Sequence, residues 1–249
     1  MQYGICNLSI VPLRSQSCNT AELTSQVLYG EHFKVLEQQK YWSKIRLAFD
    51  KHEGWIDNKQ YLLIDEQTYT NIDREITGLS SDMVEFITDH NEQLMPVPVG
   101  SHVTASSLLS HRFEGHILLG TQAKENLVDT AFLFLNAPHQ HGGKTPFGID
   151  AAGLAQMVYK LNGYPLLRQA SQQATQGEPL SFIEESEPGD LAFFDDDEGN
   201  IVHVGIIMKD NYIIHTYGKV RIDRIDHTGI FNVDTRRHTH KLRVIKKII

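Results

Sequence analysis

The sequence predicts an α+β protein in which helices packed on an antiparallel sheet follow one or two small β-barrels. The first part of the chain is cut into short segments rich in strand-forming residues, with no helical periodicity. The last part shows the spacing of two or three helices and then a series of strand-like segments. With 249 residues, 41% of them hydrophobic, the chain can bury one large core or up to three small ones.

The first predicted domain covers residues 1–65. It contains five short β-type segments, separated by turn residues or charges: YGICNLSIVPL, SQVLYG, HFKVLEQQ, YWSKIRLAF and EGWIDNKQY. This pattern is typical of a small barrel. The segment EGWI, with an aromatic residue after a glycine, is similar to the closing strand of bacterial SH3-like barrels.

Residues 66–120 contain three candidate strands between polar stretches, VEFITDH, PVPVGSHVTA and GHILLG. We expect a second SH3-like barrel in this segment.

Residues 121–249 form the third predicted domain, which begins with helices. Thr121 can cap a helix whose buried face carries Leu127, Ala131, Phe134 and Leu135. A second helix follows an Asp150 cap in AAGLAQMVYKLNG and ends near a glycine, and a shorter one is expected in LRQASQQATQG. The segments that follow predict antiparallel strands, because the turns between them are too short for a crossover helix: GDLAFF, NIVHVGIIM, NYIIHTYG, KVRIDRI and HKLRVIKKI.

The charge balance argues against two classes of partner. Against 31 Asp and Glu residues the chain has 23 Lys and Arg, a net charge of −8, and nucleic acids and anionic membranes attract the opposite sign. The longest apolar runs are far shorter than the roughly 20 residues that span a bilayer. The first residues lack the features of a secretory signal, which predicts a cytoplasmic protein, or a periplasmic or secreted one if a leader has been removed. Cys6 and Cys18 are expected to be free thiols.

The predicted second helix of the third domain begins where a reactive group would be useful. A helix N-terminus lowers the pKa of a thiol and can donate hydrogen bonds to an oxyanion. Ala151 occupies that first turn, and alternation along two neighbouring strands lets His203 and His215 converge. A nucleophile, a base and an orienting group together make a hydrolase, but here the nucleophile position holds a methyl group.

Several segments resemble the NlpC-type cell-wall cysteine peptidases, which are papain-like: GGKTPFGIDAAGLAQMVYKLNG, RQASQQATQG, EPGDLAFF, HVGIIM and YIIHTYGKVRID. The resemblance covers about residues 125–249, and the whole chain resembles bacterial members in which SH3-like barrels precede the peptidase domain. It implies cleavage of the bond between γ-D-glutamate and a diamino acid, in peptidoglycan peptides with a free N-terminal L-alanine.

Carried over position by position, the resemblance places the catalytic cysteine at Ala151, the base at His203 and the orienting residue at His215. The usual Asp-Cys-Ser-Gly stands here as Asp150-Ala151-Ala152-Gly153. The aromatic Tyr-x-Trp stands as His139-Gln140-His141, and Arg-Asp-Ala as Arg168-Gln169-Ala170. These departures cluster in the expected cleft, which favours a naturally altered site over an engineered one.

The resemblance also implies that acidic and tyrosyl groups of the first barrel meet the amine of the substrate, and Glu31 and Tyr61 are the candidates. The alternative is that both residues belong to the barrel surface. The other candidate ligand contacts are His139, Asp150, Arg168, Gln169 and Ser171, and for Asp150 a helix cap is the alternative role.

We expect no cofactor, with zinc as the alternative. His139 and His141 point the same way in an extended loop, and with His203, and in one version His215, they could form a zinc site with an open position. Ordinary polar loop histidines are the simpler interpretation. His238 and His240 could chelate a metal on a surface strand, but scattered exposed residues are the simpler interpretation.

Three hypotheses follow. The preferred one is a non-hydrolytic homologue that binds a muropeptide-like ligand or a protein partner. The second is a peptidoglycan-recycling cysteine peptidase whose nucleophile is replaced by Ala151, and the third is a hydrolase or binding protein with a metal on His139, His141 and His203. The sequence leaves the oligomeric state open.

Overall fold

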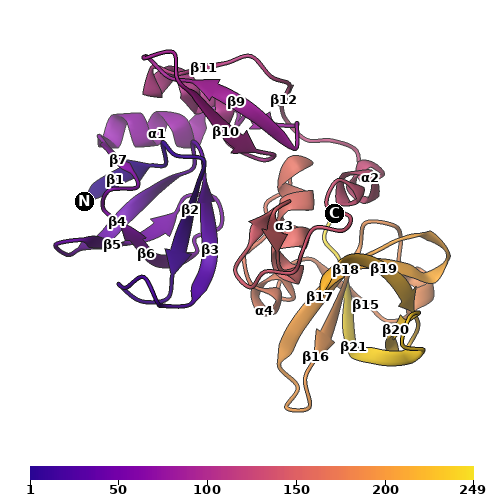
Figure 1. Ribbon diagram of the computed structural model, residues 1–249. Coiled ribbons are helices and arrows are strands. Elements are labelled where there is room, and N and C mark those ends of the chain that lie inside the picture. Colours follow the sequence, from indigo (N-terminus) through magenta and orange to yellow (C-terminus); the bar gives the residue numbers. More distant parts are fainter. The chain divides into compact units, whose positions relative to one another are not determined.

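The computed structural model describes residues 1–249 and divides into two compact units (Figure 1). The N-terminal unit consists of residues 1–120 together with 141–145, and the C-terminal unit of residues 121–140 and 146–249. The chain therefore enters the C-terminal unit, contributes one short loop to the N-terminal unit, and returns.

The N-terminal unit is built on a seven-stranded antiparallel sheet in the order β3-β2-β6-β5-β4-β1-β7. Its strands alternate buried and exposed side chains, and Val11, Leu13, Phe33, Ile45 and Ile56 fill its core without solvent exposure. The strands are β1 Gln2–Ile5, β2 Ile10–Arg14, β3 Leu23–Leu28, β4 His32–Gln38, β5 Trp42–Leu47, β6 Glu53–Asp57 and β7 Leu62–Ile64.

Residues 66–120 begin with a helix that we did not predict, α1 (Glu66–Arg74). Its N-cap is Asp65, whose Oδ1 accepts a hydrogen bond from the Thr68 amide at 2.7 Å. The rest forms two small sheets, ordered β10-β9-β11 and β12-β8, with a 3₁₀ helix between β10 and β11 along the chain, so a second barrel stays a prediction. These elements are β8 Leu79–Ser80, β9 Val84–Thr88, β10 Leu94–Pro98, η1 Val103–Leu109, β11 Arg112–Phe113 and β12 Ile117–Leu118.

The C-terminal unit contains a sheet ordered β15-β21-β16-β17-β18-β19-β20, in which β21 also pairs with β20. This extra pairing closes β16 to β21 into a six-stranded barrel. The strands are β15 Glu178–Leu180, β16 Leu191–Asp195, β17 Ile201–Ile207, β18 Tyr212–Tyr217, β19 Lys219–Ile225, β20 Gly229–Asn232 and β21 Arg237–Lys247. The sequence analysis predicted five of them and missed the short strands β15 and β20.

This unit has three helices, and two of them pack on that sheet. The three are α2 Asn126–Phe132, α3 Ala151–Leu161 and α4 Ala170–Gln173, with 3₁₀ turns at Ile183–Glu185 and Lys209–Asn211. α3 contacts β17 and β18, and α4 contacts β17. The chain also forms the two-residue strands β13 Lys144–Thr145 and β14 Gly148–Ile149 just before α3. The predicted α+β fold is confirmed.

The predicted start of the first helix was wrong. α2 begins at Asn126 after the N-cap Glu125, because the Gln122 amide donates to the carbonyl of Asn162 and holds the preceding residues outside the helix. Of the predicted buried face, Leu127, Ala131 and Phe134 are buried, whereas Leu135 is 37% exposed.

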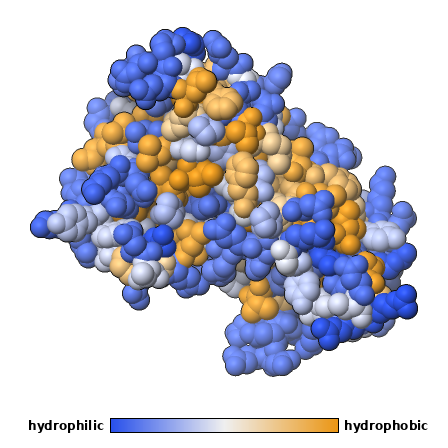
Figure 2. Space-filling model, in the orientation of Figure 1, coloured by the Kyte–Doolittle hydropathy of each residue, from blue (hydrophilic) through white to orange (hydrophobic).

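Hydrophilic and hydrophobic residues are interspersed on the face drawn in Figure 2. None of the helices is both long and apolar enough to span a membrane. Both cysteines are free, as predicted: Cys6 lies in the core of the first barrel, where burial raises its pKa to about 12, and Cys18 is exposed.

Candidate active site

The first turn of α3 is built as predicted. The Asp150 Oδ1 accepts a hydrogen bond from the Gly153 amide at 2.6 Å, so Asp150 is the N-cap and Ala151 the first helical residue. Every residue of α3 is buried, and the helix stops before Gly163, whose φ of +83° suits a glycine. The methyl group of Ala151 therefore stands at the end of the helix where backbone amides concentrate partial positive charge.

Asp150 and Arg168, both predicted ligand contacts, are bound to each other. The Arg168 guanidinium donates to both carboxylate oxygens, at 3.0 and 2.8 Å, and the Arg168 side chain is only 2% exposed. A bidentate, buried pair of this kind fixes the entrance of α3. The structure thus gives both residues an architectural role.

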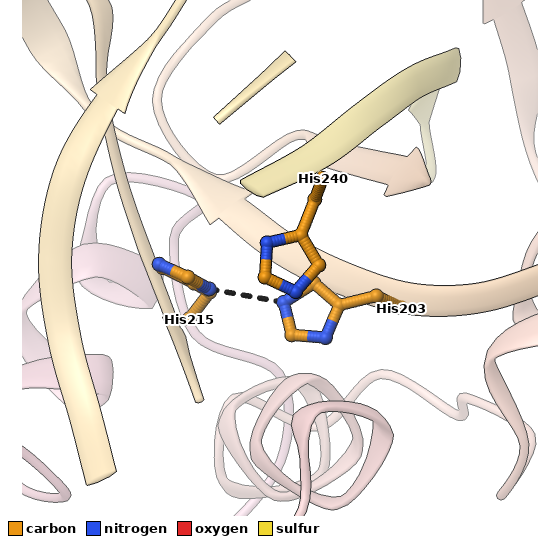
Figure 3. Close-up of side chains that lie close together, drawn as sticks. All are labelled: His203, His215 and His240. Atoms are coloured by element: carbon orange, nitrogen blue, oxygen red, sulfur yellow. Dashed lines mark hydrogen bonds between the residues drawn. The ribbon is translucent and has the colours of Figure 1, made fainter. Parts of the chain in front are cut away.

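His203 and His215 converge as alternation along the strands predicts. Gly205 of β17 lies opposite His215 of β18. His203, two residues before Gly205, is therefore the diagonal neighbour of His215 on the same face of the sheet. A Cβ atom at Gly205 would lie 2.6 Å from Ile213 and 3.1 Å from His215, so glycine makes room for this face. The His203 Nε2 and His215 Nδ1 atoms share a buried hydrogen bond at 3.0 Å (Figure 3).

Asp223 extends this pair into a chain of three side chains, and the sequence analysis missed it. The His215 Nε2 lies 3.1 Å from Asp223 Oδ2, and Arg221 donates to both oxygens of the same carboxylate. In the β18–β19 hairpin His215 pairs with Arg221, so Asp223 lies on the same face two residues on. The sequence YGKV indicates a hairpin turn, and the alternating polar residues after it could have identified Asp223.

His203 and His215 are both held in the neutral form. Burial places the pKa of His203 well below its usual value, helped by the nearby His240, His215 and His139. Burial also lowers the pKa of His215, against the opposing effect of Asp223. Burial tends to raise the pKa of Asp223, but hydrogen bonds from His215 and Arg221 outweigh it and keep the carboxyl ionised. A neutral imidazole oriented by an acceptor chain is the form that accepts a proton.

His240 is the second residue that the sequence analysis missed, because we expected an exposed position. It is partly buried, and its ring stacks on His203 with centroids 4.1 Å apart and 5.6 Å from His215 (Figure 3). Its backbone is pressed against Gly229 of β20, where any Cβ would lie 1.8 Å from the His240 carbonyl oxygen. His238, in contrast, is exposed and pairs with Asp226, as expected of a surface strand.

The other predicted members of a histidine cluster have different partners. His139 is exposed, its amide donates to the Gly218 carbonyl at 3.0 Å, and it makes the smallest named contribution to the lowered pKa of His203. His141 belongs to the N-terminal unit, where its Nε2 lies 2.7 Å from Glu22. His203 shares its cluster with His215 and His240 instead.

Gln169 and Ser171 are exposed at the start of α4. Gln169 is the N-cap, and its amide donates to the Gln172 side chain at 3.3 Å. Both residues therefore remain accessible candidates for ligand contact.

Glu31 and Tyr61, the predicted amine ligands, are buried in the N-terminal unit. The Glu31 carboxylate accepts from the ammonium of Lys144 at 3.1 and 3.2 Å, and Lys144 is fully buried. The Tyr61 hydroxyl shares a hydrogen bond with Ser43 at 2.9 Å, and its ring packs edge-on against Phe33. Glu31 thus binds an ammonium group of the chain itself, and Tyr61 packs in the barrel core.

His203, His215 and Asp223 thus form a buried chain of hydrogen-bonded side chains on the antiparallel sheet, and α3 packs against two strands of that sheet, β17 and β18. Residues 136–238 match the model of the NlpC/P60 family, and residues 13–60 match that of the bacterial dipeptidyl-peptidase Sh3 domain. The chain therefore carries an NlpC/P60 domain behind a bacterial SH3 domain, which confirms the predicted resemblance.

Curated relatives agree with this assignment. The chain is 25% identical over 231 residues to dipeptidyl-peptidase 6 of Lysinibacillus sphaericus, a match that covers 78% of this chain and 80% of the relative. It is 26% identical over 223 residues to the gamma-D-glutamyl-L-lysine dipeptidyl-peptidase of Bacillus subtilis strain 168, covering 80% of this chain and 74% of that one. Both are homologues of this protein.

Solved structures share the fold. An NlpC/P60 family protein from Bacillus cereus ATCC 10987 superposes with a TM-score of 0.75 at 17% identity, over 99% of each chain. An NlpC/P60 endopeptidase from Photobacterium damselae subsp. piscicida gives a TM-score of 0.65 at 13% identity, over 97% of this chain and 70% of its own. At these identities the likeness concerns the fold alone.

Proposed function

We propose that this NlpC/P60 homologue binds a muropeptide-like peptide with a free N-terminal L-alanine, and does not cleave it. The observation that carries the proposal is the contrast between Ala151 and its surroundings. The chain His203-His215-Asp223 has the hydrogen bonds of a working base, whereas the first turn of α3 offers a methyl group in place of a nucleophile.

The ligand class follows from the homologues. One is named for action on gamma-D-glutamyl-L-lysine peptides, and the fold of the C-terminal unit is that of their family. Loss of the thiol removes covalent catalysis but leaves the shape of a cleft. A protein partner is the alternative ligand.

The second candidate is a cysteine peptidase of peptidoglycan recycling in which Ala151 replaces the nucleophile. The retained hydrogen bonds between His203, His215 and Asp223 favour it, since a base without a nucleophile has no catalytic use. The two candidates make different predictions for an Ala151→Cys variant.

Isothermal titration calorimetry with L-Ala-γ-D-Glu-diaminopimelate tests the proposal directly. We expect saturable binding to the unaltered chain. His139 is one of the predicted ligand contacts and is exposed, so His139→Ala should weaken binding by about tenfold, or about 1.4 kcal/mol.

His227→Ala is the matched control, because His227 is an exposed histidine in the turn before β20. It should bind the peptide as the unaltered chain does. No heat of binding at millimolar peptide would remove this peptide as the ligand and leave a protein partner as the proposal.

A further inference from the structure

We propose that His203, His215 and His240 form a binding site for one zinc ion. Their ring nitrogens converge from three strands, and one ligand atom from each lies within 4.8 Å of the others. The site differs from a loop-based arrangement, since all three residues belong to the barrel of the C-terminal unit. It is independent of the peptide proposed above.

The distances suit a metal with nitrogen ligands. At a Zn–N distance of about 2.0–2.1 Å, two ligands of a tetrahedral site are about 3.3 Å apart. His203 Nε2 and His215 Nδ1 are already 3.0 Å apart, joined by the hydrogen bond drawn in Figure 3. Zinc would take the place of the shared proton, and the third ligand atom, from His240, already lies within 4.8 Å of the other two.

In two of the three histidines, the second ring nitrogen has the kind of hydrogen-bond partner that metal-bound histidines have. Metal-bound histidines donate their second nitrogen to a carboxylate or another acceptor, which fixes the ring. The second nitrogen of His215 faces the buried Asp223 carboxylate at 3.1 Å, and His240 Nδ1 lies 2.8 Å from the Thr239 hydroxyl. His240 is thus left with Nε2 for the ion.

An all-imidazole set selects the metal class. Imidazole suits zinc, copper and nickel, whereas calcium and magnesium require oxygen ligands. Three protein ligands leave one position for water or for a donor of a bound ligand. The site would therefore accept both the ion and a further small ligand.

Titration of the metal-free protein with ZnCl₂, without peptide, tests the proposal. We expect one zinc per chain and a rise in melting temperature. His240→Phe keeps a ring on His203 but no donor, and it should weaken zinc binding by at least about tenfold, since even outer-partner losses cost 10 to 100-fold. His238→Phe, two residues away on the exposed part of β21, should bind zinc normally.

A measurement without variants covers the case in which His240→Phe does not fold. CoCl₂ added to the unaltered chain should give the visible absorption of tetrahedral cobalt, and zinc should abolish it. Absence of stoichiometric metal would overturn the proposal, as would a loss of binding in His139→Ala with none in His240→Phe. Because no peptide is present, the result is separate from the test of the proposed function.

Discussion

The methyl group of Ala151 occupies a position where a thiol would be activated. It lies at the first turn of a fully buried helix that packs on the strand of His203. In a Cys18→Ser background, we expect Ala151→Cys to be alkylated by iodoacetamide at neutral pH, because the helix end lowers the thiol pKa and His203 accepts the proton. Cys6 stays unreactive, since burial raises its pKa to about 12.

The control for this reaction is a second substitution, His203→Ala. It should slow alkylation of the introduced thiol severalfold. Equal rates with and without His203 would show that the imidazole does not act on position 151.

Lys144 and Glu31 form a buried ion pair in the N-terminal unit. The Lys144 ammonium is enclosed with the Glu31 carboxylate at 3.1 Å. Lys144→Met removes the ammonium group that balances the charge of this buried carboxylate, and should cost about 3–5 kcal/mol in urea unfolding. The exposed pair of His141 and Glu22 offers the comparison: His141→Gln should leave the unfolding midpoint almost unchanged. Equal effects of the two variants would contradict the burial argument.

Two helices with the same kind of cap should respond differently to its loss. Asp65 caps α1 on the surface, whereas Asp150 caps α3 and also binds the buried Arg168. Asp150→Ala should therefore cost about 3–5 kcal/mol, because it removes the carboxylate that balances the charge of a buried guanidinium. Asp65→Ala loses only a cap and should cost much less. Denaturant unfolding of the two variants, with Asp150→Asn to separate cap from charge, checks this.

The elements that were predictable carry local signals. α3 lies between an aspartate cap and a glycine stop, and the pairing of His203 with His215 follows from alternation along adjacent strands. We did not predict α1, although Asp65 is a residue type that commonly caps the N-terminus of a helix. The position of His240 could not be predicted, since it depends on the register of β20 and β21, a bulge, and a close approach at Gly229.

The stability of the whole C-terminal unit should depend on pH through its buried histidines. Burial lowers the pKa of His203 and His215, and that of His240 from 6.5 to about 4. The unfolded chain then binds more protons below pH 6.5, so stability is complete above that pH and falls toward pH 4, by up to about 1.4 kcal/mol per pH unit for each histidine.

Urea unfolding from pH 7.5 to 4.5, in the presence of EDTA, measures this dependence. His240→Gln should make the profile less steep. The exposed His227→Gln should leave it unchanged. A profile that is flat in the unaltered chain would contradict neutral burial of the cluster.

At the scale of the molecule, the proposed function rests on an NlpC/P60 domain in which the hydrogen-bonded residues His203, His215 and Asp223 occur together with an alanine at position 151. Mass-spectrometric turnover of L-Ala-γ-D-Glu-diaminopimelate by the unaltered chain, with Ala151→Cys in parallel and each with and without zinc, tests this most directly. The account predicts an intact peptide with the unaltered chain in both conditions, and product from Ala151→Cys would favour the peptidase whose nucleophile is replaced. Cleavage by the unaltered chain would contradict the account.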